Sequence, residues 1–363
     1  MVQYRKRFVE KMEQYMKRMA TYEGPNMDIT IPPDSENGPE IVLVVHDECC
    51  FNSHEGKNTI WVEKGKTPLR PKGKGRSYMV SEFLCQCHGH MQLTPEQAAQ
   101  LPVPLQHTIA QRTLTPGVNE EGYWKGEHVV AQLKEEAIAI FNILHPGKVA
   151  LFMFDNSSNH NVFAPDALKC EKLNLSDGGA GGKERSIMRD GMHNGIPQPM
   201  HINGKQLGLQ SILGGRALWI DKMKKDEAMA IVRELPDFKG QLPWIKETVL
   251  TAGHLVIFLP KFHCEFNWIE RYWGAAKKYT RKYCDYTWEG LMATVPAALQ
   301  SVSLAKMRKF ARKSFRYMDA YRQQVNDEYL SPEHAEYCVK KYKSHRSVRE
   351  YITADDYTEM AKL

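Results

Sequence analysis

Three acidic residues stand where they could bind metal ions. Asp47 ends the apolar run IVLVVHD, and Asp155 ends a second run, KVALFMFD. Glu270 comes just after a third run, HLVIFLP. Three carboxylates that converge on one crevice repel each other, and a hard divalent cation relieves that repulsion. We predict that these three side chains hold two Mg²⁺ or Mn²⁺ ions, which can activate water on one side of a phosphodiester and stabilise the leaving oxygen on the other.

Each acid also has an ordinary structural interpretation. An Asp that follows a strand often caps a helix or forms a turn. Glu270 could be a solvated helix residue paired with Arg271 or Lys277. Glu48 comes directly after Asp47, and adjacent strand residues point to opposite faces, so both can bind one ion only if the strand has already ended.

The segments around these acids follow an α/β pattern. Continuous apolar runs are typical of strands buried on both faces of a sheet, and ligands gather at the carboxyl ends of such strands. Strands are predicted at 41–47, 59–64, 77–85, 148–155 and 254–260. Helices are predicted at 3–21, 126–144, 221–238, 266–282, 287–300 and 303–325. We therefore expect an α/β sheet with helices on its faces.

The same pattern divides the chain into segments. We expect an N-terminal helix and linker (1–40), the first part of the core (41–162), an insertion (163–250), the end of the core with the third acid (251–300), and a basic C-terminal helix and tail (301–363). A glycine-rich stretch at 177–185 is predicted to be a loop within the insertion.

Taken together, the three acidic segments resemble the DDE superfamily of transposases and endonucleases, in its mariner-like lineage. The whole chain is also similar to fungal-type DDE endonuclease domains. The matching blocks read VVHDECCF with Asp47 and Glu48, FMFDNSSNH with Asp155, Asn156 and His160, and IFLPKFHCEFNWIERYW with Asn267, Ile269, Glu270 and Trp273.

This resemblance implies a fold and a function. The fold would be an RNase H-like mixed sheet flanked by helices, with an insertion before the last catalytic helix. The activity would be metal-dependent DNA cleavage and strand transfer, with Asp47, Asp155 and Glu270 as catalytic metal ligands. Glu48, Asn156, His160, Glu265 and Asn267 are weaker candidates near the site. We expect double-stranded DNA as partner, a homodimer as one assembly, nuclear localisation, no membrane and no small-molecule cofactor. The alternative is a catalytically inactive, domesticated DNA-binding descendant.

The sequence departs from the family pattern around the third acid. Glu270 lies 115 positions after Asp155 (270 minus 155), which is far more than mariner-like proteins usually have. His263 and Cys264 replace a common Ser-Pro pair. Glu265 stands where the family often has another acid and is therefore the rival to Glu270 as third ligand.

Two groups of basic residues are candidates for contact with the DNA backbone. The first is a loop with Lys64, Lys66, Arg70, Lys72, Lys74 and Arg76. The second lies on two predicted helices, with Lys277, Lys278, Arg308, Arg312 and Arg316. Simple solvation of charged surfaces explains both groups equally well. The formal net charge of +6 permits a polyanionic partner without requiring one.

The cysteines do not form a zinc-finger pattern. The segment Cys85-Gln-Cys87-His88-Gly-His90 could bind zinc through soft ligands, but no second pair follows at finger spacing. Two thiols in a Cys-x-Cys strand lie on one face beside the buried sheet, and we favour that interpretation.

Overall fold

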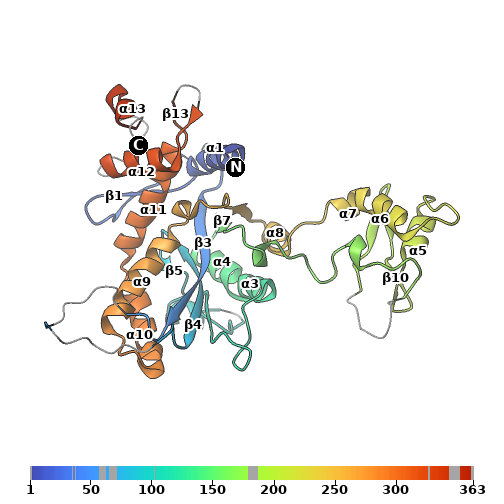
Figure 1. Ribbon diagram of the computed structural model, residues 1–363, viewed down its shortest axis with the longest axis horizontal. Coiled ribbons are helices and arrows are strands. Elements are labelled where there is room, and N and C mark those ends of the chain that lie inside the picture. Colours follow the sequence, from blue (N-terminus) through green and yellow to red (C-terminus); the bar gives the residue numbers. More distant parts are fainter. Residues whose placement is uncertain are drawn as a thin grey trace. The chain divides into compact units, whose positions relative to one another are not determined.

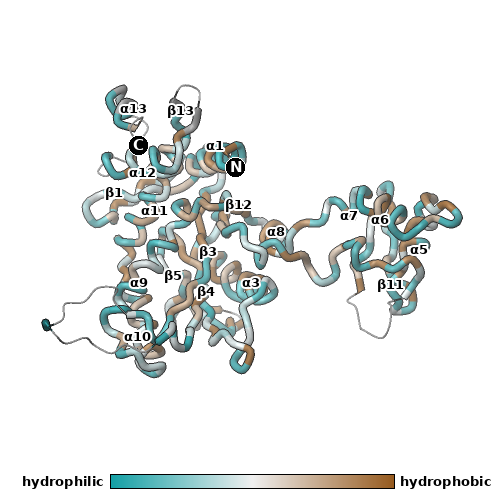
Figure 2. Tube along the Cα trace, viewed as in Figure 1, coloured by the Kyte–Doolittle hydropathy of each residue, from teal (hydrophilic) through white to brown (hydrophobic). Residues whose placement is uncertain are grey.

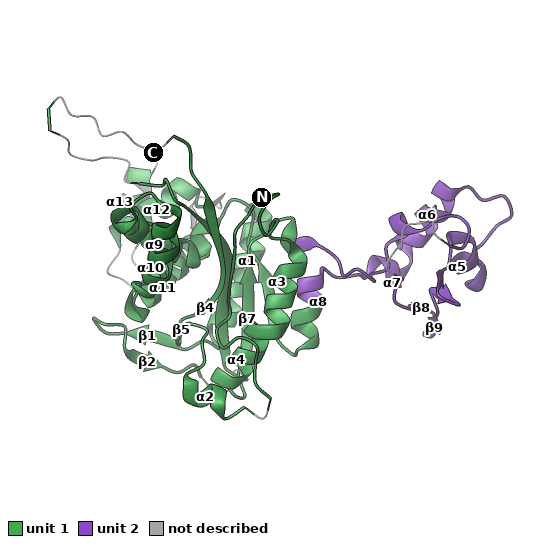
Figure 3. Ribbon diagram, turned by 90° about the horizontal axis from the view of Figure 1, so that it is seen from below, with its two compact units in different colours: residues 1–160, 248–363 green, residues 161–247 purple. Residues whose placement is uncertain are grey.

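The computed structural model describes residues 2–34, 36, 38–56, 63–64, 72–101, 103–178, 187–325, 328–342 and 352–360. The chain forms two compact units (Figure 3). The first unit comprises residues 1–160 and 248–363, and the second comprises residues 161–247. The candidate catalytic residues all belong to the first unit.

A mixed sheet is the centre of the first unit (Figure 1). Its main order is β12 (Leu255–Phe258), β7 (Val149–Phe154), β3 (Ile41–Asn52) and β4 (Ser77–Cys85). The short strands β5 (Gly89–His90) and β6 (Gln111–Leu114) both pair with β4. Strands β3, β7 and β12 are parallel, whereas β4 is antiparallel to β3. This mixed sheet confirms the predicted α/β fold class.

Helices cover both faces of the sheet (Figures 1 and 3). One face carries α1 (Val2–Met16), α9 (Ile269–Tyr283), α10 (Trp288–Gln300) and α11 (Leu304–Ala320). The other face carries α3 (Gly126–Gln132) and α4 (Ile138–Leu144). A π-helical segment, Leu133–Ala137, joins those two helices into one continuous rod. Its bounds match the single amphipathic helix that the sequence predicts at 126–144.

The side chains of β3 alternate between the two faces of the sheet, so this strand packs against the helices on both sides. Its odd-numbered residues, such as Leu43 and Val45, lie in the apolar cluster beneath α9. On the opposite face, Phe83 packs edge-to-face against the rings of Phe152 and Phe154. Figure 2 shows the resulting hydrophobic centre, with hydrophilic residues on the surrounding helices. An acid placed on β3 can therefore face either layer, depending only on whether its number is odd or even.

Smaller elements complete the first unit. The N-terminal part has β1 (Thr21–Glu23), β2 (Ile29–Ile31) and α2 (Pro95–Ala99); the C-terminal part has β13 (Gln324–Val325), β14 (Glu328–Tyr329), α12 (Pro332–Lys341) and α13 (Ala354–Met360). The sequence shows no clear period after residue 328, yet two helices form there. Within the parts of the chain that the structure describes, no helix has the length and apolar character needed to span a membrane.

The second unit has its own hydrophobic core. It contains β8 (Gly191–His193), β9 (Ile196–Gln198), β10 (His201–Ile202), β11 (Lys205–Gln206), α5 (Leu209–Gly215), α6 (Lys225–Glu234) and α7 (Pro236–Lys239). Arg216 forms two hydrogen bonds to the carboxylate of Asp237, and both side chains are nearly inaccessible to solvent. Helix α8 (Trp244–Thr251) leads from this unit back into the first.

Three predicted helices and one predicted strand differ from the structure. The helix expected at 221–238 is divided into α6 and α7, because Leu235 is extended before Pro236. The helix expected at 3–21 ends at Met16, because the chain turns there into β1. The helix expected at 303–325 ends at Ala320. The strand expected at 59–64 lies almost wholly outside the described residues, and residues 63–64 are not in a strand.

Candidate active site

The strand register places Asp47 beside Asp155. Strands β3 and β7 are parallel neighbours, and Val45 is paired with Met153. Asp47 and Asp155 each lie two residues further along their strands, so they reach the same level at the carboxyl end of the sheet. Asp155 directly follows the last residue of β7, and its side chain is about half exposed, at 46%.

Glu270 lies in the first turn of α9, and two contacts hold that turn against the sheet. The amide Nδ2 of Asn267 donates to the backbone carbonyl of His46, the residue before Asp47, at 3.2 Å. The hydroxyl of Tyr272 donates to Oε2 of Glu82 on β4 at 2.9 Å. Because these contacts lie on either side of Glu270 in sequence, they fix the start of α9 over the end of β3.

Glu82 is an acid that the sequence interpretation missed. It pairs directly with Asp47 across the β3–β4 ladder, so the two side chains lie on the same face of the sheet. Glu82 is buried and also contacts Nδ1 of His90 at 2.5 Å. Glu82 lies in the middle of a strand with no acid next to it in the sequence, so the sequence did not indicate that it lies beside Asp47.

The three predicted ligands influence one another electrostatically. Burial raises the pKa of Asp47 well above its usual range, and the charges of Glu270 and Glu48 raise it further. Burial also raises the pKa of Glu270, with a contribution from Asp155, while Lys277 and Arg271 lower it only in part. The protein's own cations therefore leave negative charge uncompensated at this end of the sheet.

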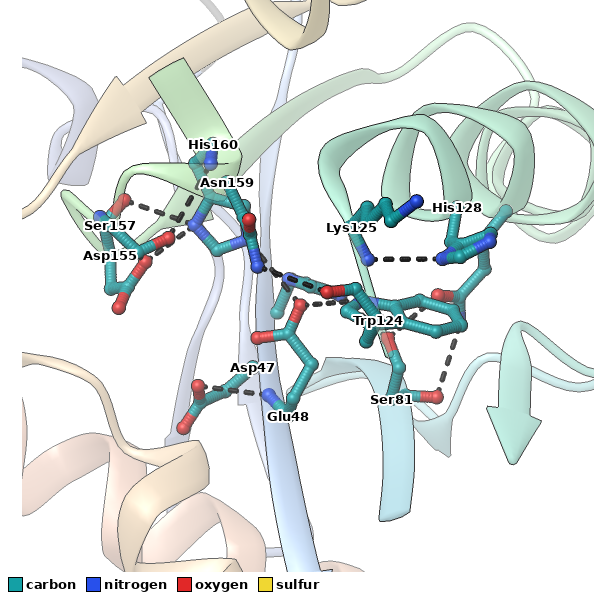
Figure 4. A network of polar contacts seen from close by, with 12 residues as sticks. Asp47, Glu48, Ser81, Trp124, Lys125, His128, Asp155, Ser157, Asn159 and His160 are labelled. Carbon is teal, nitrogen blue, oxygen red and sulfur yellow. Dashed lines mark hydrogen bonds and ion pairs between the residues drawn. The ribbon is translucent and has the colours of Figure 1, made fainter. Parts of the chain in front are cut away.

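Hydrogen bonds occupy one oxygen of each aspartate. Oδ1 of Asp47 accepts the backbone N–H of Glu48 at 2.9 Å. Oδ1 of Asp155 contacts Nδ1 of His160 at 2.5 Å and accepts the backbone N–H of Ser157 at 3.1 Å (Figure 4). These hydrogen bonds restrict the rotation of both carboxylates at this end of the sheet.

Glu48 belongs to a separate network on the opposite face. Strand β3 continues to Asn52, so the alternation of faces persists at this position. Oε1 of Glu48 accepts from Nε1 of Trp124 at 2.8 Å and lies 3.6 Å from Nε2 of His160. Figure 4 shows the carboxylates of Asp47 and Glu48 pointing in different directions.

His160 connects the two faces. It is fully buried, and burial alone would lower its pKa, but the adjacent Asp155 and Glu48 raise the pKa to about 10. The pKa of Asp155 is lowered, since the hydrogen bond from His160 outweighs burial. His160 is therefore an imidazolium between two carboxylates. Asn156, the remaining candidate of this block, is half-buried beside Asp155.

One ion cannot be shared by all three predicted ligands as they stand. Among the described residues, two groups have three ligand atoms all within 4.8 Å of one another: His46–Glu48–His160 and Cys85–Cys87–His145. Asp47, Asp155 and Glu270 are not such a group. Carboxylates arranged around two ions, which lie about 3.5–4 Å apart, need a wider spacing than the ligands of one ion.

Glu265 has different partners from Glu270. Its Oε1 lies 2.7 Å from Nδ1 of His263. Burial would raise the pKa of Glu265, but His263 and a hydrogen bond with Tyr321 lower it below the ordinary value. The carboxylate of Glu265 is thus satisfied within the protein, whereas burial and the negative charge of Asp155 raise the pKa of Glu270.

The predicted basic loop is only partly described. Lys66 and Arg70 lie outside the described residues, and Lys64, Lys72 and Lys74 are exposed. Arg76 is exposed, pairs with Glu120 at 2.9 Å, and lies over the ring of Trp288 at 4.1 Å.

The interpretation of Arg308, Arg312 and Arg316 as one exposed stripe needs correction. The guanidinium of Arg308 donates to the carbonyls of Gln86, Met27 and Cys87 at 2.8–3.1 Å, which bind it inside the fold. Arg316 is buried and donates to a carbonyl of α12 at 2.7 Å. Arg312 is half-buried between them. On α9, by contrast, Lys278 is exposed and Lys277 lies close enough to lower the pKa of Glu270.

Comparison with known proteins gives distant structural likenesses. A chain of the Mos1 transposase paired-end complex with left transposon end is similar over 77% of this chain and 53% of that chain, with 9% identity and a TM-score of 0.39. A chain of the Mos1 strand transfer complex is similar over 59% of this chain and 54% of that one, with 15% identity and a TM-score of 0.21. The protein thus spans about half the length of those transposase chains. No family model and no curated protein matches the sequence.

Proposed function

We propose that this chain is a metal-dependent nuclease and strand transferase of the DDE type, acting on double-stranded DNA. The observation that supports this most strongly is the register of β3 and β7. It places Asp47 and Asp155 side by side at the carboxyl end of a parallel pair, with Glu270 close enough to raise the pKa of Asp47. The order of these acids along the chain is that of the mariner-like and fungal DDE proteins which the sequence resembles.

The donor set fits Mg²⁺ or Mn²⁺. All three side chains offer oxygen, which hard divalent cations prefer. Burial raises the pKa values of Asp47 and Glu270; the charges of Glu270 and Glu48 add to the shift at Asp47, and the charge of Asp155 adds to the shift at Glu270. Asp47, Asp155 and Glu270 would hold the ions, which when bound would activate water and stabilise the leaving oxygen of a phosphodiester.

The remaining side chains would position these ligands. His160 and the backbone of Ser157 hold Oδ1 of Asp155 and so restrict the orientation of its carboxylate. Asn267 anchors the first turn of α9 beside Asp47 and so sets the place of Glu270. Buried partners of this kind restrict the rotamers of a metal ligand.

Lysines near the carboxylates would contact the phosphates of the DNA backbone. Lys277 comes seven residues after Glu270, which is about two helical turns, so both lie on one side of α9. Lys277 and Lys74 both lower the pKa of Cys50, three residues beyond Asp47, which brings the two lysines to the same region. Phosphate contacts by such residues give binding that weakens as salt rises.

Nicking of supercoiled plasmid tests this proposal. We expect purified protein to nick the plasmid with Mg²⁺ or Mn²⁺ and not with a chelator. Asp155→Asn and Glu270→Gln should reduce nicking to background, while the matched control Glu265→Gln should retain it. DNA binding without nicking, by well-folded protein with either metal, would instead support an inactive DNA-binding descendant. Loss of nicking in Glu265→Gln but not in Glu270→Gln would assign the third ligand to Glu265.

A further inference from the structure

A second group of metal-ligating side chains lies away from the carboxylates. Cys85 ends β4, and Cys87 lies in the turn that leads to β5. His145 follows α4, sixty residues after Cys85 in the chain, yet its Nε2 lies 3.8 Å from Sγ of Cys85. The ligand atoms of these three residues all lie within 4.8 Å of one another.

This group and the candidate active site lie at different positions along the strands of the sheet. Cys85 pairs with Val44, whereas Asp47 lies three residues further along β3. His145 precedes β7, and Asp155 follows that strand at its other end. The cysteines and the carboxylates therefore belong to different regions of the sheet.

We propose that Cys85, Cys87 and His145 form a zinc-class metal site that ties the β4–β5 turn to the end of α4. The exposed His88 is the candidate for the fourth ligand, because its Nδ1 lies 3.9 Å from Sγ of Cys85 and its ring centroid lies 4.9 Å from that of His145.

The spacing of the atoms suits a shared ion. With Zn–S and Zn–N distances of about 2.3 and 2.0–2.1 Å, tetrahedral ligands are roughly 3.6 Å apart. The two nitrogen–sulfur distances at Cys85, 3.8 and 3.9 Å, are close to that separation. Both distances also lie within the range of hydrogen bonds that involve sulfur, so the three side chains already face one another without an ion.

A further contact holds Cys87 in place. The hydroxyl of Tyr22 donates to Sγ of Cys87 at 3.2 Å.

Arg308 acts as a brace for the ligand turn. Its guanidinium donates to the carbonyls of Gln86 and Cys87, and it lies over the ring of Tyr22 at 3.9 Å. This explains why an arginine predicted to contact DNA is directed inward. Arg308 and Lys148 also place positive charge near His88 and His145, so a bound cation must gain its affinity from the two thiolates.

Metal content and cobalt spectroscopy of the full chain test this site. We expect about one zinc per chain after purification without chelator. Cobalt(II) added to zinc-free protein should give the thiolate-to-metal charge-transfer absorption that carboxylate ligands cannot produce. Cys87→Ser and His145→Gln should each lower zinc affinity by at least about tenfold. Loss of a residue that only supports a metal ligand already costs about 10–100-fold, and loss of a direct ligand should cost no less.

The controls separate this site from the carboxylate site and from misfolding. Cys284→Ser removes a half-buried thiol elsewhere in the same unit and should bind zinc as the wild type does. Asp155→Asn should also retain zinc, whatever happens to nicking. No charge-transfer absorption with wild-type protein would overturn the proposal, and so would equal zinc content in wild type and Cys87→Ser.

Discussion

Removing the charge of Asp47 should stabilise the metal-free protein. Burial and the charges of Glu270 and Glu48 raise the pKa of this carboxyl, so the folded state holds its proton more tightly than the unfolded chain does. The ionised group therefore lowers the free energy of unfolding at every pH above its ordinary value of 3.8. Asp47→Asn keeps the shape of the side chain and removes that cost.

The size of the effect follows from charge repulsion near a protein surface. Relief of one such repulsion is worth on the order of 1–2 kcal/mol at pH 7. For a unit of this length, about 2–4 °C in melting temperature corresponds to 1 kcal/mol, so we expect a rise of about 2–8 °C. In the wild type, Mg²⁺ at about ten times its Kd should recover some 1.4 kcal/mol by binding the folded state. Asp47→Asn should lose most of that response.

Melting temperature, measured with EDTA and with Mg²⁺ at pH 7, tests both halves of this reasoning. Asp28→Asn is the matched control, because Asp28 is an exposed aspartate in the same unit. It should change neither value. A lower melting temperature of metal-free Asp47→Asn would refute the repulsion argument, and an undiminished response to Mg²⁺ would remove Asp47 from the metal site.

Three further outcomes are expected. Asn267→Ala removes an anchor of α9 and should cost about 1–2 kcal/mol in denaturant unfolding, with a larger loss of nicking than of DNA affinity. The raised pKa of His160 means that its pairing with Asp155 stabilises the fold fully below pH 6.5 and fades as pH rises to about 10. Thermal melts between pH 6.5 and 10 should therefore fall more steeply for the wild type than for His160→Gln; parallel curves would contradict the ion pair. Arg308→Ala should lower the free energy of unfolding and leave the salt dependence of DNA binding unchanged. Lys277→Ala should instead make DNA binding less dependent on salt and leave stability unchanged. The reverse result would show that Arg308 contacts DNA.

The fold could be predicted because its signals are local. The runs that end on Asp47 and Asp155 are continuously apolar, and the first is rich in β-branched residues, as is typical of buried parallel strands. The bounds of β4 and of the rod at 126–144 agree with the sequence for the same reason, since each has a clear period or apolar run. The C-terminal helices lack such periods. Ser331 and Pro332 are a local signal for the start of α12, but the packing of α12 on α11 and of α13 on α12 depends on contacts between segments.

The surroundings of the site could not be predicted, because they depend on contacts between distant segments. Glu82 becomes a neighbour of Asp47 only through the β3–β4 register. His145 meets Cys85 only when α4 packs on the sheet. Charged side chains mislead in a different way: the long stem of Arg308 lets its charged end reach backbone carbonyls inside the protein, so a basic helix stripe does not by itself mark a binding surface.

The two faces of β3 give its acids different roles. Because the strand runs on past Asp47 to Asn52, Glu48 must face the opposite layer, where Trp124 and His160 hold it. His160 then reaches around the end of β7 to Asp155 and links the structural carboxylate to the candidate ligand. A change at Glu48 should therefore act on Asp155 through the orientation of His160 rather than through loss of a metal ligand, and this distinction separates a positioning role from a catalytic one.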